Sequence, residues 1–231
     1  KVLKKENNLI VGEDKIIEGN PHFIPDEKKL RMEIILDNKD LDDLVDGHKI
    51  QVNIVKEMGK YKYLGEVVKI IGHKNDPGVD ILSIIYDHGI NDVFTDEVME
   101  EVNELPSEVL DSDRKGRKDL TDMTIFTIDG DDTKDIDDAI SISKKGENYI
   151  LGVHIADVSY YVKEGTALYK EAYSRGTSVY LVDRVVPMLP HKLSNGICSL
   201  NPNVDRLAIS CIMEITPNGK IVSHDIFESI I

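Results

Sequence analysis

Six of the ten residues from Asp129 to Asp138 are aspartate, in the run DGDDTKDIDD. Like charges at this density repel one another and raise one another's pKa values, so the run is costly to hold in a folded chain. A divalent cation removes that cost, because Mg²⁺ and Mn²⁺ prefer hard carboxylate oxygens as ligands. The run therefore predicts a metal-dependent reaction site, held in place by the elements that flank it.

The net charge of the chain limits the substrates that such a site can take. Lys and Arg number 28 against 43 Asp and Glu, which gives a net charge of −15 at pH 7. This balance argues against a surface that binds nucleic acid through cations alone, since that binding depends on Lys and Arg at phosphates. Metal ions can bridge carboxylates and phosphates, however, so a polyanionic substrate stays compatible with the acidic run.

Length and hydropathy indicate a folded protein of one or two domains. The 231 residues are 41% apolar, enough for a buried core, and no apolar run resembles a membrane span or a secretion signal. We therefore expect a cytoplasmic protein without membrane contact. The first residue is Lys1 rather than Met, which indicates a piece of a longer protein.

The first two segments of the chain differ in their pattern. Residues 1–72 read as about five short strands joined by turns, which favours a small OB-like β-barrel. The expected strands are 15–18, 32–36, 48–55, 61–64 and 66–71, with a bulge at Gly65. Residues 73–120 read as a helical connector, with helices at 79–88 and 92–105. They include a polar linker at 112–119, whose basic residues we expect to be solvated rather than bound to phosphate.

Residues 121–231 mix strand and helix patterns. A strand at 124–128 is expected to lead into the acidic run. The remaining expected elements are a hairpin at 139–155, a helix at 164–175, a strand at 177–181 and a hairpin at 206–227. The fold class predicted for the chain is therefore α+β: a small OB-like β-barrel, a helical connector, and the N-terminal portion of a mixed α+β catalytic domain.

Four of the six aspartates have a spacing that suits two metal ions. Asp129 follows a predicted strand, Asp135 and Asp137 share one side of an extended segment, and Asp138 can face a second metal. Four carboxylates on two adjoining segments can hold two metals roughly 4 Å apart, the arrangement that serves in-line phosphodiester hydrolysis. The spacing therefore favours hydrolysis of a phosphodiester.

Two other interpretations compete with a catalytic metal site. An EF-hand loop counted from Asp129 fails, because Thr133, Lys134 and Ile140 fill its fifth, sixth and twelfth positions. A solvated acidic loop remains open, although the apolar strands predicted tight against both ends make it less favoured.

The residues around the run resemble a known family. The segments TIDG and KDIDDA, which hold Asp129 and residues 134–139, are similar to the signature of the ribonuclease II/ribonuclease R catalytic domain, the RNB domain. Further similar segments follow in the family's order: HIADVSYYV at 154–162, RGTSVYL at 175–181, VPMLP at 186–190, and CSLNP and DRLA within 198–208. Residues 76–85 resemble the bacterial ribonuclease R connector, and 1–72 stand where the family has its second cold-shock domain.

The resemblance implies a processive 3′→5′ exoribonuclease of the ribonuclease II type, which hydrolyses RNA to nucleoside 5′-monophosphates with Mg²⁺, or with Mn²⁺ in its place. It implies metal binding by Asp129, Asp135, Asp137 and Asp138, with Asp137 indispensable for the chemistry and Asp135 supporting it. Tyr180 matches the family tyrosine that stacks on the terminal bases, a contact that tolerates any base. The expected partners are 3′ ends of single-stranded or structured RNA, with no DNA and no membrane.

The remaining polar residues of these segments have less defined roles. Arg206 is a candidate RNA contact, with a contact to the acidic run as an equal alternative. His154 and Asp157 suggest a general-base pair, but two-metal hydrolysis needs no His base, so a core histidine is favoured. Asp131 and Asp132 match no family ligand and are expected to carry charge outside the ligand set.

The extent of the resemblance leaves the activity of this piece open. The chain stops at Ile231, before the family's distal arginine, so we expect a fragment of a ribonuclease R-like enzyme with a truncated catalytic domain. The main alternative is an RNA-binding module without catalysis. A Ca²⁺-binding structural protein is a remote third, given the failed EF-hand match.

Overall fold

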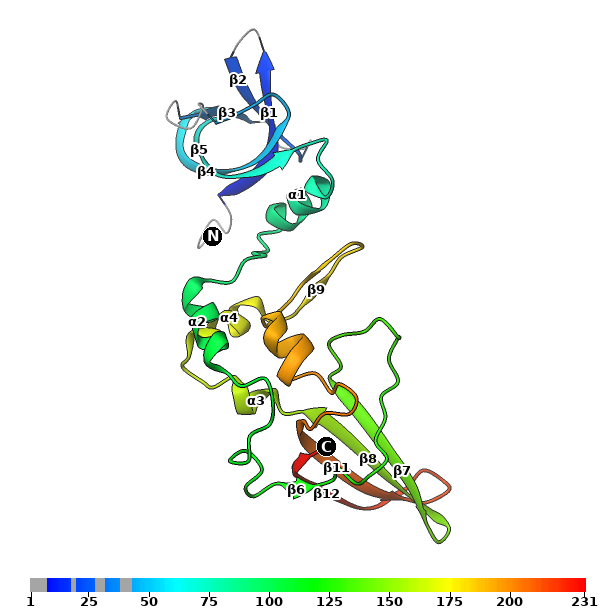
Figure 1. Ribbon diagram of the computed structural model, residues 1–231. Helices are drawn as coiled ribbons and strands as arrows, with labels where there is room; N and C mark the ends of the chain where they lie inside the picture. Colours follow the sequence, from blue (N-terminus) through cyan, green and yellow to red (C-terminus); the bar gives the residue numbers. More distant parts are fainter. Residues whose placement is uncertain (1–7, 18–19, 28–31, 38–42) are drawn as a thin grey trace. The chain divides into compact units, whose positions relative to one another are not determined.

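The computed structural model describes residues 8–17, 20–27, 32–37 and 43–231. These residues fall into two compact units, within 1–92 and 93–231, and each unit has a core of its own (Figure 1). Glu18, the last residue of the predicted strand 15–18, lies outside the described residues. The expected α+β class is confirmed, whereas the predicted domain limits at 72 and 120 stay a prediction.

The first unit is built on a closed five-stranded barrel, as expected for an OB-like fold (Figure 1). The strands neighbour one another in the order β1-β2-β3-β5-β4, and β4 pairs back onto β1 to close the barrel. They are β1 (Leu9–Ile17), β2 (Asn20–Pro25), β3 (Glu33–Leu36), β4 (His48–Gly59) and β5 (Lys62–His73).

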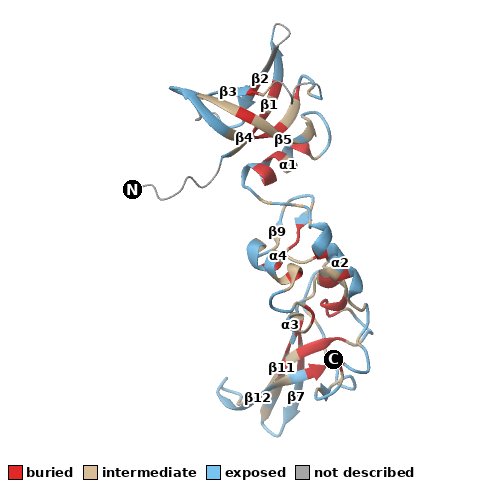
Figure 2. Ribbon diagram, turned by 90° about the vertical axis from the view of Figure 1, so that its left-hand side faces the viewer, coloured by how far each residue is buried: buried red, intermediate tan, exposed pale blue. Residues whose placement is uncertain are grey.

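The strand predicted at 48–55 is confirmed as part of β4, whose Ile50 and Val52 are buried in the barrel interior with Phe23. Figure 2 shows buried stretches on the strands of this barrel. The expected bulge lies opposite its predicted position: β4, not Gly65 of β5, holds the additional residue, between Ile54 and Lys56. Gly65 instead allows a close approach of the two strands, since a Cβ there would lie 2.3 Å from a methyl of Val52.

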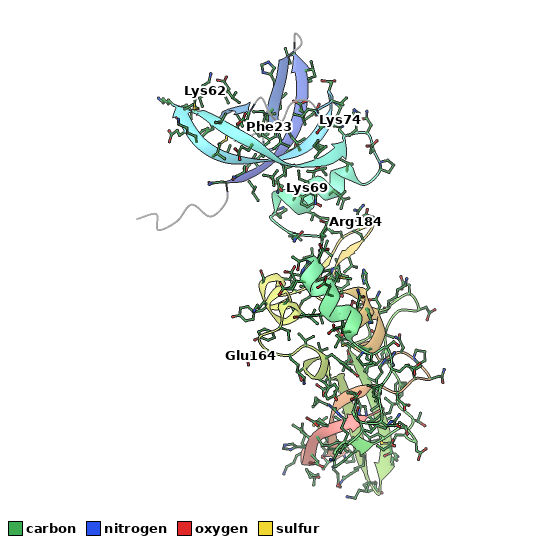
Figure 3. The ribbon with its side chains drawn as sticks, turned by 60° about the vertical axis from the view of Figure 1, so that its left-hand side comes forward. Phe23, Lys62, Lys69, Lys74, Glu164 and Arg184 are labelled. Carbon is green, nitrogen blue, oxygen red and sulfur yellow. The ribbon has the colours of Figure 1, made fainter. Side chains whose placement is uncertain are left out.

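Helix α1 (Val79–Asp87) lies in the first unit and packs on β1, β4 and β5. Gln51 of β4 donates a hydrogen bond to the carbonyl of Tyr86 at 3.0 Å. The ammonium group of Lys69, labelled in Figure 3, lies 4.0 Å from the centre of the Tyr86 ring. A cation over an aromatic face is attractive, so both contacts hold the predicted helix against the barrel.

The second unit begins with a helical layer around an apolar core. Helices α2 and α4 start later than the predicted 92 and 164, because Thr95 and Thr166 cap their first turns through side-chain oxygens. None of the helices in the described residues has the length and apolar character needed to cross a bilayer. The helices are α2 (Asp96–Glu104), α3 (Val158–Tyr161), α4 (Ala167–Arg175) and the π-helical segment η2 (Lys192–Ile197).

A five-stranded sheet in the order β6-β12-β11-β8-β7 completes the second unit (Figure 1). Both predicted hairpins are confirmed, whereas the predicted strand 124–128 is reduced to one bridge between Phe126 and Ile140. A separate two-stranded ribbon pairs β9 (Val179–Tyr180) with β10 (Val185–Val186). The sheet strands are β6 (Lys118–Asp119), β7 (Asp138–Lys145), β8 (Asn148–Ala156), β11 (Leu207–Ile215) and β12 (Ile221–Ile230).

The polar linker 112–119 is more ordered than expected. Its last two residues, Lys118 and Asp119, form strand β6, which runs parallel to β12. The guanidinium of Arg117 meets the carboxylate of Asp157 at 2.6 Å, with side chains only 3% and 4% exposed. The expectation of a solvated basic loop is therefore wrong for Arg117, because its side chain is buried in an ion pair with Asp157.

Candidate active site

The acidic run forms an irregular loop at the β7 edge of the sheet. The bridge between Phe126 and Ile140 closes its first end, and Asp138 begins β7 at the other. The carbonyl of Asp137 accepts a hydrogen bond from the amide of Ala156 on β8 at 2.9 Å. The loop is therefore tied to the sheet immediately beside its aspartates.

A second segment holds the loop from its other side. The hydroxyl of Ser199 donates to the carbonyl of Lys134 at 2.8 Å and accepts from the amide of Ile136 at 3.0 Å. The amide of Leu200 donates to the carbonyl of Ile136 at 2.8 Å. These bonds fix the backbone at 134–137. Such anchoring argues against the interpretation of the run as a purely solvated acidic loop.

Three of the predicted aspartates act electrostatically on the fourth, Asp137. The pKa of Asp137 is raised, first because the surrounding protein reduces the hydration of its carboxylate, and then by the charges of Asp135, Asp138 and Asp129, in that order. The structure therefore places the four residues selected by their spacing within reach of each other's fields.

The described residues contain no group of three or more His, Cys, Asp or Glu side chains arranged to hold a metal ion. The donor set nevertheless fits a hard divalent cation, because it consists of carboxylates with access to solvent. A cation among them would offset the repulsion from Asp135, Asp138 and Asp129, which adds to the effect of reduced hydration on the pKa of Asp137.

Tyr180 lies beside the acidic loop, at the end of β9. Its hydroxyl donates a hydrogen bond to a carboxylate oxygen of Asp135, which raises the pKa of Tyr180 to about 12. The residue remains 65% exposed, so its ring is accessible. The structure therefore brings together the predicted stacking residue and one of the predicted metal ligands.

An open pocket of about 870 Å³ lies between the acidic loop and the segments that follow β9. Its acidic lining consists of Asp129, Asp132 and Asp135, and neither Asp137 nor Asp138 lines it. Besides Tyr180, it is also lined by three basic or titratable residues, Lys134, Arg184 and His191. Figure 3 labels Arg184, which lies in the turn of the β9–β10 ribbon. Sequence patterns gave no signal for this grouping, because the three residues belong to separate loops.

Arg206 is buried rather than presented to solvent, with 7% of its surface exposed. Its Nε donates to the carbonyl of Ser199 at 2.8 Å, and its Nη1 to the carbonyl of Asp205 at 2.9 Å. These bonds give the guanidinium a structural role in the observed arrangement. The predicted RNA contact of Arg206 stays a prediction.

His154 is a fully buried core histidine, which is the interpretation favoured from the sequence. Its two ring nitrogens lie 3.0 Å from the hydroxyl of Ser141 and 2.7 Å from that of Ser210. Burial lowers the pKa of the imidazole. The carboxylate of Asp157 instead forms an ion pair with Arg117, so His154 and Asp157 do not form a general-base pair.

Comparison with known protein families matches most of the chain. The RNB domain matches residues 117–231, and the cold shock domain matches residues 22–95. Ribonuclease R of Thermotoga maritima is 47% identical over 216 residues, which cover 90% of this chain and 30% of that protein. Ribonuclease R of Vibrio parahaemolyticus is 38% identical over 232 residues, which cover 100% of this chain and 28% of that protein. The chain therefore spans less than a third of the length of these relatives.

Solved structures show the same arrangement of elements. Mycoplasma genitalium RNase R in complex with ribose-methylated single-stranded RNA has a TM-score of 0.92 and 28% identity, covering 100% of this chain and 37% of that chain. The same protein in complex with double-stranded RNA has a TM-score of 0.92, 28% identity and coverage of 100% and 41%. Yeast Ssd1, described as a pseudonuclease, has a TM-score of 0.75 at 21% identity over 99% of this chain and 30% of that one, a likeness of fold alone.

Proposed function

We propose, because this chain belongs to the RNB family of ribonucleases, that the natural protein containing it degrades RNA from the 3′ end to nucleoside 5′-monophosphates. The observation that carries the proposal is the geometry of the acidic loop: Ser199, Leu200 and Ala156 hydrogen-bond its backbone at 134–137, and Tyr180 donates to the carboxylate of Asp135. A cluster of carboxylates on such an anchored loop is suited to a metal-dependent phosphodiesterase.

Asp129, Asp135, Asp137 and Asp138 would hold Mg²⁺, or Mn²⁺ in its place. When bound there, divalent ions supply water activation and stabilisation of the leaving oxyanion. Asp129 and Asp138 serve as ligands, and Asp137 is indispensable for the chemistry. Asp135 supports the cluster and accepts the hydrogen bond of Tyr180, which links the ligand set to the RNA-binding surface.

The exposed ring of Tyr180 stacks on the terminal bases and orients the 3′ end toward the aspartates. Lys134, Arg184 and His191 line the same pocket and offer donors to the RNA phosphates. This local concentration of donors lets an acidic protein, with a net charge of −15, accept a polyanion.

Single-stranded and structured RNA 3′ ends are the proposed substrates, with no DNA, in a cytoplasmic protein. Complexes of Mycoplasma genitalium RNase R with single- and double-stranded RNA support this substrate class. The barrel within residues 1–72, the connector 73–120 and the catalytic portion 121–231 form the proposed domains. Because the chain spans less than a third of the length of its ribonuclease R relatives, the proposal concerns the natural protein that contains these residues.

The substitution Asp137→Asn in the natural protein tests the proposal. It removes one charge from the centre of the cluster and should abolish release of nucleoside monophosphates from a labelled oligoribonucleotide in Mg²⁺, while RNA binding persists. Asp131→Asn is the matched control, since it removes a charge from the same loop outside the proposed ligand set. Monophosphate release by Asp137→Asn at the wild-type rate would refute the assignment.

An RNA-binding module without catalysis is the second candidate function. The closed barrel of the first unit favours keeping it, because barrels of this type bind oligonucleotides without catalysing a reaction. Under this alternative the wild-type protein binds labelled RNA in Mg²⁺ and releases no monophosphate at any enzyme concentration.

A further inference from the structure

The side chain of Ser199 contacts the backbone on both sides of Asp135. Its hydroxyl donates to the carbonyl of Lys134 at 2.8 Å and accepts from the amide of Ile136 at 3.0 Å. A third contact, to Oδ1 of Asn201, is longer at 3.4 Å. Because a hydroxyl has one proton to donate, the closer Lys134 carbonyl takes it. Ser199 is fully buried, so water does not compete for these bonds.

Neighbouring bonds extend this support along the loop. The amide of Leu200 donates to the carbonyl of Ile136 at 2.8 Å, and the amide of Ala156 to the carbonyl of Asp137 at 2.9 Å. Ile136 therefore has both backbone groups paired to one fixed segment. The side chains of Asp135 and Asp137 leave from a backbone whose direction is set by these bonds.

Arg206 in turn holds Ser199. Its Nε donates to the carbonyl of Ser199 at 2.8 Å. Its own amide donates to the carbonyl of Ile231 at 2.9 Å, and the amide of Ile231 donates back at 3.0 Å. Ile231, which follows β12, thus fixes the backbone of Arg206, and the buried guanidinium of Arg206 fixes the backbone of Ser199. The hydroxyl of Ser199 in turn holds the acidic loop.

We propose that Ser199 is a positioning residue for the proposed metal site: its buried hydroxyl presets the backbone around Asp135, and Arg206 keeps Ser199 in place. The inference rests on the proposed function for the identity of the ligands. Groups that orient ligands without touching the metal contribute strongly to affinity, and losing one typically costs about 10–100-fold in metal binding or activity. Ser199 meets this description through backbone contacts.

Calorimetric titration of the natural protein with Mg²⁺, in the absence of RNA, measures the effect directly. Ser199→Ala should weaken Mg²⁺ binding by about 10–100-fold. Ser229→Ala is the matched control: it also removes a fully buried hydroxyl of the second unit, but that hydroxyl bonds to Ser210 and Ala208. Ser229→Ala should leave Mg²⁺ affinity unchanged. Ser199→Thr, which retains the hydroxyl, should restore most of the affinity.

Amide hydrogen exchange gives a second readout that needs neither metal nor activity. In the metal-free wild-type protein the amides of Ile136 and Leu200 should exchange slowly, and Ser199→Ala should accelerate exchange at Ile136 in particular. The wild-type protein alone can overturn the proposal: the amide of Ile136 would then exchange as fast as the amide of the exposed Asp132. This result does not depend on whether the Ser199→Ala variant folds. An equal loss of Mg²⁺ affinity in Ser199→Ala and Ser229→Ala would also overturn it.

The two readouts separate this inference from the proposed function. A wild-type protein that binds no Mg²⁺ refutes the proposed metal site, whereas slow exchange at Ile136 that is lost in Ser199→Ala still supports the positioning of the loop. Conversely, tight Mg²⁺ binding that Ser199→Ala leaves intact refutes the positioning role and leaves the proposed function standing.

Discussion

The ion pair between Arg117 and Asp157 is a point at which one substitution should remove much of the stability of the second unit. The two side chains meet at 2.6 Å and are 3% and 4% exposed. Asp157 also accepts from the hydroxyl of Ser159 at 2.8 Å. Arg117 lies 5.0 Å from the ring centre of Tyr160. Asp157→Ala would leave the buried guanidinium with only the exposed Glu228, 4.0 Å away, as a carboxylate partner.

Breaking a buried pair by removing one partner costs about 3–5 kcal/mol, because the remaining charge stays desolvated. A domain of ordinary stability has only about 5–15 kcal/mol to lose. With a urea slope of about 2 kcal/mol per molar, the midpoint of unfolding should fall by about 1.5–2.5 M. Replacing both partners, as in Arg117→Met with Asp157→Leu, should recover most of that loss, since no charge is then buried.

Urea denaturation of the 231-residue chain, followed by far-ultraviolet circular dichroism, is a suitable assay. Two units with separate cores are expected to give two transitions, so a single two-state fit would be invalid. Only the transition of the unit 93–231 should shift, and the barrel transition is the internal control. A shift below about 0.5 M for Asp157→Ala, equivalent to about 1 kcal/mol, would refute the reasoning that the pair is desolvated.

Two further predictions concern Tyr180 and His154. Tyr180→Ala should lengthen the shortest RNA product on a denaturing gel, whereas Tyr180→Phe keeps the ring and should not; stacking is worth about 1–3 kcal/mol per base. An unchanged product ladder in Tyr180→Ala would remove the stacking role. The pKa of buried His154 is lowered below its unfolded value near 6.5, so the unfolded chain binds more protons and stability falls as pH drops below that value. Between pH 7.5 and 5, the free energy of unfolding measured in urea should decrease more for the wild type than for His154→Asn. An equal decrease in the two proteins would contradict this prediction.

The local signals of the sequence predicted most regular elements. The strand pattern at 48–55 located β4, and the strand patterns at 139–155 and 206–227 located both hairpins. The starts of α2 and α4 were predicted too early, although Thr95 and Thr166 are typical N-cap residues. The π-helical segment at Lys192–Ile197 had no comparable signal, since tertiary packing rather than periodicity holds it.

The site was predictable where a motif is continuous and unpredictable where contacts are distant. The spacing of the acidic run selected four aspartates, three of which raise the pKa of the fourth, Asp137. The bond from Tyr180 to Asp135 crosses 45 positions, and the bonds of Ser199 to the loop cross 63 and 65. Arg117 likewise meets Asp157 40 positions away. A periodic pattern in the sequence does not indicate contacts between residues so far apart. The burial of Arg117 and Arg206 was therefore found only in the structure.

The 65 positions between Lys134 and Ser199 have a consequence during protein synthesis. A ribosome adds about 5–20 residues per second, so the acidic loop is made roughly 3–13 s before the serine that anchors it. During that interval the nascent chain carries the aspartates without the bonds that preset them. The order of translation thereby delays maturation of the site until Ser199 has been added to the chain.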